Sequence, residues 1–243
     1  MIRNPDKKKE GLLEFYITPN HACPYLDDQQ SKTLFMSPEI QATDRLYNGL
    51  IENGFRRSGD HVYRPHCDSC KACISLRVPC NDFSLSKQQK RCAKKGLRFI
   101  QQIQSAHFDQ DHYQLFERYI NARHTDGDMY PTSEKQYREF ILCDWLNTQF
   151  LDLIEPTTGK LIACLVFDEL ESGTSAIYSF FDPALSKFSP GRLLVLKLIE
   201  LTKQKQLDYV YLGYWIKNCR KMSYKGEYRP VECFVEEHWV PLS

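Results

Sequence analysis

Apolar residues recur at helical spacing in two early segments of the chain. Ser37-Pro38-Glu39 supplies an N-cap, a proline suited to the first helical position and an early acid, and apolar residues then follow at helical spacing. Gly54 is a stop signal, so the pattern predicts a helix over about 37–54. Residues 84–95, before Gly96, predict a second helix, and residues 97–104 alternate as a strand does.

Two more helices are expected after this strand, at about 110–123 and 134–147. Ser133 stands three residues ahead of Gln136, which is a capping-box pattern. Short apolar runs separated by turn residues then predict a three-stranded antiparallel meander, with strands at 150–155, 161–170 and 175–181. The remaining expected elements are a Leu-rich amphipathic helix at 191–206 and strands at 207–214 and 231–240.

From residue 97 onwards, this order of strands and helices resembles the N-acyltransferase (GNAT-like) fold. The expected fold class is therefore α/β (α+β), with a small cysteine-bearing N-terminal domain at residues 1–95. A GNAT-like domain with a mixed, mainly antiparallel sheet is expected at residues 96–243. In that superfamily a [QR]-x-x-G-x-[GA] loop at a helix N-terminus holds the pyrophosphate of coenzyme A. The corresponding segment, 188–193, lacks this loop, so we expect no coenzyme A as a partner.

Charge is distributed unevenly along the chain. Residues 1–104 contain 17 Lys and Arg against 11 Asp and Glu, and residues 105–243 contain 15 against 20. The two parts therefore carry +6 and −5, which agrees with the net charge of +1. The basic part is the better candidate for meeting a polyanion.

The N-terminus from Met1 to Lys9 is polar and charged, with no apolar stretch behind it. This pattern indicates neither a secretory signal nor a transmembrane segment, so we expect a cytoplasmic protein without a membrane partner. With 42% hydrophobic residues in 243, the chain can bury a core, and disorder is disfavoured. Its ten cysteines are expected to stay reduced, which disfavours a disulfide framework.

Six short stretches carry distinctive residue combinations. They are His21 to Leu26, Arg64 to Val78 with its three cysteines, Arg123 to Met129, Tyr178 to Pro183, Tyr211 to Ile216 and Lys221 to Lys225. In this order they resemble the bacterial aspartate/glutamate leucyltransferases and, more distantly, the eukaryotic arginyl-tRNA–protein transferases. The resemblance covers about residues 12–235, and each stretch alone is a weak signal.

The resemblance implies an aminoacyltransferase that moves leucine from leucyl-tRNA to the α-amine of proteins beginning with Asp or Glu. Such transfer marks the acceptor for degradation through the N-end rule. Arginyl transfer to the same acceptors is the alternative within this class, because only similarity to the shorter bacterial members favours leucine. A metal-binding RNA-binding module without catalysis is the alternative from another class. The chemistry requires no cofactor, because an amine attacks an activated ester and positioning supplies most of the rate.

The cysteine triplet is the sharpest local signal. Two residues separate Cys67 from Cys70 and Cys70 from Cys73, so their thiolates can surround one soft metal ion, with Cys23 as a fourth ligand. Zinc and an iron–sulfur cluster both fit, and the association of the eukaryotic relatives with such a cluster favours the second. Reduced, buried cysteines are the alternative.

Two basic segments suit tRNA. The first places six cations in twelve residues without an acid, at Lys87, Lys90, Arg91, Lys94, Lys95 and Arg98. Their charge density would attract phosphates, and a solvated helix is the alternative. The second interleaves Lys217, Arg220, Lys221, Lys225 and Arg229 with Tyr214, Trp215, Tyr224 and Tyr228. Aromatic rings among cations suit stacking on an unpaired CCA end, although some of these rings belong to the core.

The acidic first side chain of the acceptor requires a cation, and Arg77 and Lys225 are the two candidates. Tyr178 and Asp182, near the end of the central strand, are the candidates for holding the attacking amine.

Further substrate-binding candidates lie in the stretches that carry the resemblance. They are Asp126, Asp128, Tyr214, Lys221 and Tyr224. For Asp126 and Asp128, which flank Gly127, a turn is the alternative explanation.

Overall fold

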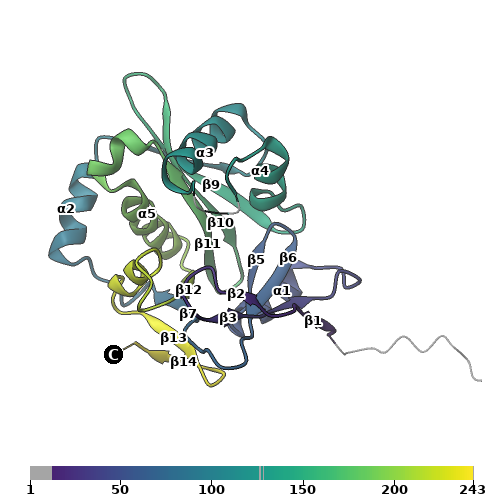
Figure 1. The fold of residues 1–243 in the computed structure, drawn as a ribbon. Helices are drawn as coiled ribbons and strands as arrows, with labels where there is room; N and C mark the ends of the chain where they lie inside the picture. Colours follow the sequence, from purple (N-terminus) through teal and green to yellow (C-terminus); the bar gives the residue numbers. More distant parts are fainter. Residues whose placement is uncertain (1–12, 126, 128, 243) are drawn as a thin grey trace, which may run out of the picture.

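The main feature of the computed structural model, which describes residues 13–125, 127 and 129–242, is an eight-stranded sheet. Its order is β14-β13-β7-β12-β11-β10-β9-β8 (Figure 1). The strands are β7 (Ile74–Pro79), β8 (Ile100–Ser105), β9 (Asn147–Ile154), β10 (Leu161–Glu169), β11 (Gly173–Phe181), β12 (Tyr209–Trp215), β13 (Glu232–Val235) and β14 (His238–Pro241). Every neighbouring pair is antiparallel except β11 and β12. The predicted α+β class with a mixed, mainly antiparallel sheet is confirmed.

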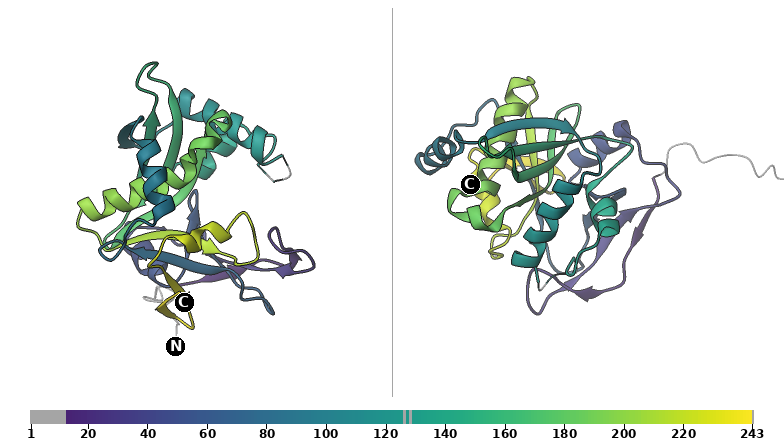
Figure 2. Two further views of the ribbon diagram at one scale, coloured as in Figure 1. Left: turned by 90° about the vertical axis from the view of Figure 1, so that its left-hand side faces the viewer. Right: turned by 90° about the horizontal axis from the view of Figure 1, so that it is seen from above.

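Helices cover both faces of this sheet (Figures 1 and 2). They are α3 (Gln110–Arg123) and α4 (Glu134–Ile141) on one face, and α5 (Pro190–Gln204) with α2 (Lys87–Gly96) against it on the other. Alternate residues of β10 pack against the helices on opposite faces of the sheet. Leu165 lies in the core cluster that contains α5, and Val166 lies in the cluster that contains α3. Because β10 is buried on both faces, it reads in the sequence as a continuous apolar run.

The N-terminal part forms a second sheet of order β1-β4-β6-β5 and a two-stranded ribbon of β2 and β3. Their bounds are β1 (Phe15–Ile17), β2 (His21–Ala22), β3 (Gln30–Ser31), β4 (Thr33–Met36), β5 (Arg56–Ser58) and β6 (His61–Pro65), and α1 (Asp44–Glu52) packs beside them. Tyr47 and Ile51 of α1 share a core cluster with Tyr211 of β12. The division of the chain at residue 95 stays a prediction, and the eight-stranded sheet takes strands from both sides of it.

The structure corrects two predicted helix bounds. The first helix begins at Asp44 rather than near Ser37, because Thr43 is the N-cap and its side chain accepts from the amide of Leu46. Ser37 instead closes a turn, in which its carbonyl accepts from the amide of Ile40 at 3.1 Å. The helix after Ser133 begins with the predicted capping box but ends at Ile141 rather than at residue 147.

The final predicted strand, 231–240, is two strands. β13 and β14 form an antiparallel hairpin that turns at Glu236 and Glu237, whose φ angles are 49° and 63°. Two successive left-handed residues are typical of a tight hairpin turn, in which Gly and Asn are the usual residues. Two glutamates gave no such signal in the sequence. The remaining elements are two short 3₁₀ helices, η1 (Pro183–Phe188) and η2 (Ser223–Glu227).

Within the described residues, no helix combines the length and the apolar character needed to cross a membrane.

Candidate active site

The parallel strands β11 and β12 separate partway along their length. They pair only from Gly173 to Ser175 and from Tyr209 to Tyr211, although both strands continue beyond these residues. The backbone groups beyond the pairing need other partners, because unpaired buried carbonyls are costly. A gap between the two strands is therefore a place where side chains from other elements can enter.

Arg56, from β5, enters this gap. Its guanidinium donates to the hydroxyl of Ser175 at 2.9 Å, to the carbonyl of Tyr211 at 3.4 Å and to the carbonyl of Ala176. It therefore supplies hydrogen bonds to both separating strands. Gly213 makes room for it, because a Cβ at that position would lie 3.3 Å from Nε of Arg56, and its φ of +77° also favours glycine.

Lys225, from η2, hydrogen-bonds to the same strand, β12, as Arg56, and it lies close enough to feel the charge of Arg56. Its ammonium donates to the carbonyl of Tyr214 at 2.8 Å and lies 3.6 Å from the sulfur of Met222. Burial, together with the charge of Arg56, lowers the pKa of Lys225 to about 7. Across residues 13–125, 127 and 129–242, no carboxylate lies within 4 Å of either cation. The gap thus contains two neighbouring positive charges without a compensating acid.

The two candidates for holding the amine lie on and beyond the free part of β11. Tyr178 is partly buried, with its ring 5.1 Å from Phe140 and 5.9 Å from Phe116, and burial raises the pKa of its phenol. Asp182 follows the strand and caps η1, since its carboxylate accepts from the amide of Ala184 at 3.0 Å. The same carboxylate lies 3.2 Å from the ammonium of Lys160.

Arg77 lies away from the gap, on β7, and its charge is compensated. Its guanidinium donates to Glu52 and to Glu232, each at 2.7 Å. The rings of Tyr209 and Trp239 lie 3.7 and 4.4 Å from its central carbon. This guanidinium is therefore built into the structure by two carboxylates and two rings.

The other predicted substrate-binding residues are placed differently from one another. Tyr214 is buried, and its hydroxyl lies between two carbonyl acceptors, 2.9 Å from that of Gly54 and 3.2 Å from that of Tyr63. Lys221 and Tyr224 are exposed. Asp126 and Asp128 lie outside the described residues.

The six cations predicted to meet tRNA lie on or just beyond α2. All six are exposed, and the capping box of Ser86 and Gln89 fixes the start of the helix. Its inner side is closely packed, because a Cβ on Gly96 would lie 2.4 Å from Leu193 of α5. Arg98 lies over the ring of Phe188, and no ion pair is formed by the other five within the described parts of the chain.

Cys23, Cys67, Cys70 and Cys73 line one cavity of about 710 Å³. Burial raises the pKa of Cys73 to about 12, and the neighbouring thiols of the other three add to the rise. No three of these four sulfurs, all of them described, lie within 4.8 Å of one another. The donor set fits a soft metal, but the spacing is wider than that of a preformed tetrahedral zinc site, in which each sulfur lies about 2.3 Å from the ion.

His112, Asp152 and Cys164 form a group whose ligand atoms do lie within 4.8 Å of one another. The imidazole of His112 bridges two carboxylates, with Nδ1 2.9 Å from Asp109 and Nε2 3.0 Å from Asp152. Asp152 also accepts from Gln104 at 2.7 Å. These hydrogen bonds satisfy the buried polar atoms of His112 and Asp152, so we interpret the group as a structural network.

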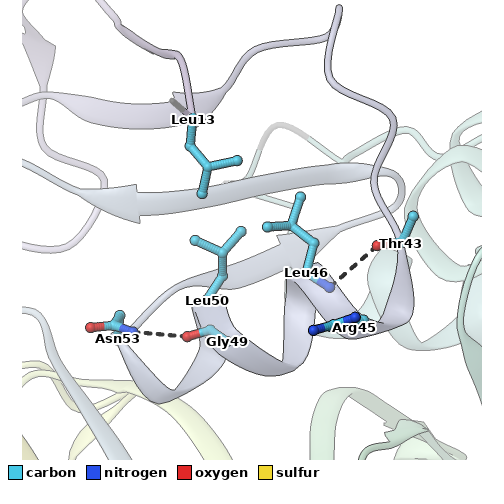
Figure 3. Close-up of a pocket in the computed structure, with 7 residues that line it drawn as sticks. All are labelled: Leu13, Thr43, Arg45, Leu46, Gly49, Leu50 and Asn53. Carbon is cyan, nitrogen blue, oxygen red and sulfur yellow. Dashed lines mark hydrogen bonds between the residues drawn. The ribbon is translucent and has the colours of Figure 1, made fainter. Parts of the chain in front are cut away.

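A hollow beside α1 is a poor candidate for a functional site. It is lined by Leu13, Thr43, Arg45, Leu46, Gly49, Leu50 and Asn53 (Figure 3). Thr43 and Asn53 already make hydrogen bonds at the two ends of the helix, to the amide of Leu46 and the carbonyl of Gly49. The lining contains no acid, and the hydroxyl of Thr43 serves as the N-cap of the helix.

Arg56 is the functional candidate that the sequence analysis missed. The available signal was the dipeptide Arg56-Arg57 directly after the apolar Phe55. Two adjacent cations in a segment that the fold buries require partners, and those of Arg56 are 119 to 155 residues away along the chain.

Comparisons with known proteins show which family this chain belongs to. The family model for the arginine-tRNA-protein transferase N terminus matches residues 21–91, and the family model for its C terminus matches residues 111–235. An aspartate/glutamate leucyltransferase from Teredinibacter turnerae is 46% identical over 234 residues, which cover 96% of each chain. One from Alcanivorax borkumensis is 46% identical over 233 residues, again covering 96% of each chain.

Two solved structures are more weakly similar. The C-terminal domain of a putative lysylphosphatidylglycerol synthetase from Agrobacterium fabrum is 13% identical, with a TM-score of 0.49, covering 83% of this chain and 64% of that one. FemX is 9% identical, with a TM-score of 0.45, covering 85% and 81%. The sequence matches are much stronger, and they show that the chain belongs to the arginine-tRNA-protein transferase family.

Proposed function

We propose that this protein is an aspartate/glutamate leucyltransferase, which moves leucine from leucyl-tRNA to the α-amine of proteins beginning with Asp or Glu. The observation that carries the proposal is the 46% identity over 234 residues to a relative of that name, with 96% of both chains covered. In this proposal the protein acts in the cytoplasm, and the added leucine marks the acceptor for degradation through the N-end rule.

The proposed reaction replaces an ester with an amide. The neutral α-amine attacks the leucyl carbonyl, a C–N bond forms, and the bond to the ribose 3′-oxygen breaks. The proton lost by the amine passes to the departing oxygen, with the ribose 2′-hydroxyl as a relay. An α-amine has a pKa of about 7.7–8.0, so part of it is neutral at cellular pH. Orientation of the two reactants can supply about 7–11 kcal/mol of the rate enhancement.

In this proposal Tyr178 and Asp182 hold the attacking amine. Tyr178 belongs to the part of β11 that has separated from β12, and its ring packs against Phe116 and Phe140. Asp182 would have to exchange its contact with Lys160 for the amine. The basic face of α2 would bind tRNA phosphates through cations that lack acidic partners.

The test uses the purified full chain with labelled leucyl-tRNA or arginyl-tRNA and peptides beginning with Asp, Glu or Ala. We expect leucine on the Asp and Glu peptides and none on the Ala peptide. Transfer of arginine instead would support the arginyl alternative. Binding of tRNA without any transfer would support the RNA-binding module.

We also propose that Cys23, Cys67, Cys70 and Cys73 hold a metal, either an iron–sulfur cluster or zinc. Such a group would stabilise the fold around the cavity, because binding free energy contributes to folding. Protein purified without oxygen should carry near-stoichiometric iron or zinc. Cys70→Ser should lose that metal and melt earlier, whereas Cys143→Ser, outside the cavity, should retain it. Metal-free parent protein with full activity would support buried, reduced thiols.

A further inference from the structure

Arg56 differs from the other buried arginines in its partners. Arg57 and Arg77 each make ion pairs with carboxylates at 2.6 to 2.7 Å. Arg56, only 6% exposed, donates to one hydroxyl and two carbonyls. A buried cation without an acid is costly, and a second cation beside it increases the cost.

Both cations retain hydrogen-bonding capacity. A guanidinium has five N–H donors, and Arg56 uses three of them on acceptors in the described chain. An ammonium has three donors, and Lys225 directs one to a carbonyl and one toward a thioether. Two donors of Arg56 and one of Lys225 therefore remain for a ligand.

The chemistry of these donors selects a carboxylate. Charge-assisted hydrogen bonds from guanidinium and ammonium groups to a carboxylate are about twice as strong as neutral ones. A neutral amide of the same shape would accept the hydrogen bonds but would leave both charges uncompensated. Burial and the charge of Arg56 lower the pKa of Lys225, and a bound carboxylate would oppose both effects.

The position of the two cations matches the needs of the reaction. In an N-terminal Asp or Glu, only two or three carbons separate the carboxylate from the α-amine, so its receptor must lie beside the reacting centre. Arg56 contacts Ala176, two residues before Tyr178 on the separated part of β11. Lys225 is only partly buried, so a ligand can reach the pair from outside.

We propose that Arg56 and Lys225 together form the receptor for the acidic side chain of the acceptor, with Lys225 and the free donors of Arg56 binding the carboxylate. This inference rests on the proposed function and deepens it, because it assigns acceptor specificity to the gap between β11 and β12. Arg77, with both its carboxylates in place, has no part in this receptor.

The experiment measures peptide binding to the full chain without tRNA, by titration calorimetry. The probes are two peptides that differ only in their first residue, Asp or Asn. The variants are Arg56→Lys and Lys225→Met, and Lys203→Met is the matched loss of an exposed cation on α5. We expect each of the first two variants to bind the Asp peptide at least about 30-fold more weakly, with a much smaller loss for the Asn peptide. Lys203→Met should bind both as the parent does.

Three results would overturn the inference. In the first, the parent binds Asp and Asn peptides equally. In the second, both variants bind the Asp peptide as the parent does. In the third, the variants lose affinity for leucyl-tRNA and keep the preference for Asp, so that the two cations serve the nucleic acid. If Arg56→Lys unfolds more easily, Lys225→Met decides, because its ammonium makes a single backbone hydrogen bond.

Leucyl transfer is assayed separately, so failure of the proposed function can be recognised. A parent protein that prefers the Asp peptide but transfers no leucine would overturn the function and leave the receptor standing.

Discussion

Arg56 and Arg57 are neighbours on β5, yet their surroundings are opposite. Arg57 makes two hydrogen bonds to Asp168, at 2.6 and 2.7 Å, with both side chains fully buried. Burial alone would lower the pKa of Arg57, but the carboxylate raises it above its usual value. Arg56 meets carbonyls and a hydroxyl in place of an acid. The partner that the main sheet supplies therefore decides whether a buried guanidinium is part of the framework or available to a ligand.

The largest effect should follow from breaking the pair of Arg57. Arg57→Met leaves Asp168 charged and buried, so we expect a loss of about 3–5 kcal/mol in the free energy of unfolding. Urea unfolding followed by circular dichroism measures it. The double variant Arg57→Met, Asp168→Leu should recover much of the loss, because no uncompensated charge remains. A loss below 1 kcal/mol in the single variant would mean that the pair is not a framework element.

The exposed cations of α2 extend the comparison to the surface. Replacing Lys90, Arg91, Lys94 and Lys95 with Gln should weaken tRNA binding by more than about tenfold at low salt and flatten its salt dependence, since each phosphate contact contributes about 0.7–0.9 to the slope. Filter binding over a range of salt concentrations measures both quantities. The control variant replaces Lys203 and Lys205, near the end of α5, with Gln. An unchanged slope would remove α2 from the tRNA site.

The sequence makes Arg77 a candidate for binding the acidic side chain of the acceptor, whereas the structure pairs it with two carboxylates, and a substitution distinguishes the two. Arg77→Met removes two ion pairs that are partly exposed, so we expect a loss of about 2 kcal/mol in stability. Transfer to Asp peptides, per folded molecule, should be retained. If the variant kept its stability but lost the preference for Asp over Asn peptides, Arg77 would be the residue that binds the acidic side chain.

The smallest effect concerns the pH dependence of the His112 network. Burial would lower the pKa of His112, but hydrogen bonds to Asp152 and Asp109 raise it. Because the folded pKa exceeds the unfolded value of about 6.5, the stabilisation is complete below that pH and is lost as pH rises through the folded pKa. Unfolding free energies of the parent should fall across this window, and those of His112→Gln should not. Parallel curves for the two proteins would contradict this account.

Local signals predicted the elements that local interactions define. α3 was predicted with its observed bounds, and its N-cap is Asp109, whose side chain accepts from two backbone amides of the first turn. The meander of β9, β10 and β11 was predicted because short apolar runs alternate with turn residues. The strand β7 was missed, since it follows the cysteine triplet and its pairing partners β12 and β13 come more than 120 residues later.

The site was harder to predict, because its chemistry depends on distant partners. From the sequence, Arg77 and Lys225 were equal candidates for meeting an acid. The two carboxylates that compensate Arg77 are 25 and 155 residues away along the chain. The hydrogen-bond partners of Arg56, none of them an acid, are also distant along the chain, and no spacing rule in the sequence reveals them.

The place of β12 in the main sheet has a consequence for synthesis on the ribosome. β12 lies between β7 and β11, yet it is made after both. Until residue 215 has emerged, the nascent chain presents β7 and the free edge of β11, each with unpaired backbone groups that can template aggregation. Messages that end prematurely between residues 181 and 209 should therefore yield chains that aggregate or are cleared quickly, although β7 and β11 are already complete.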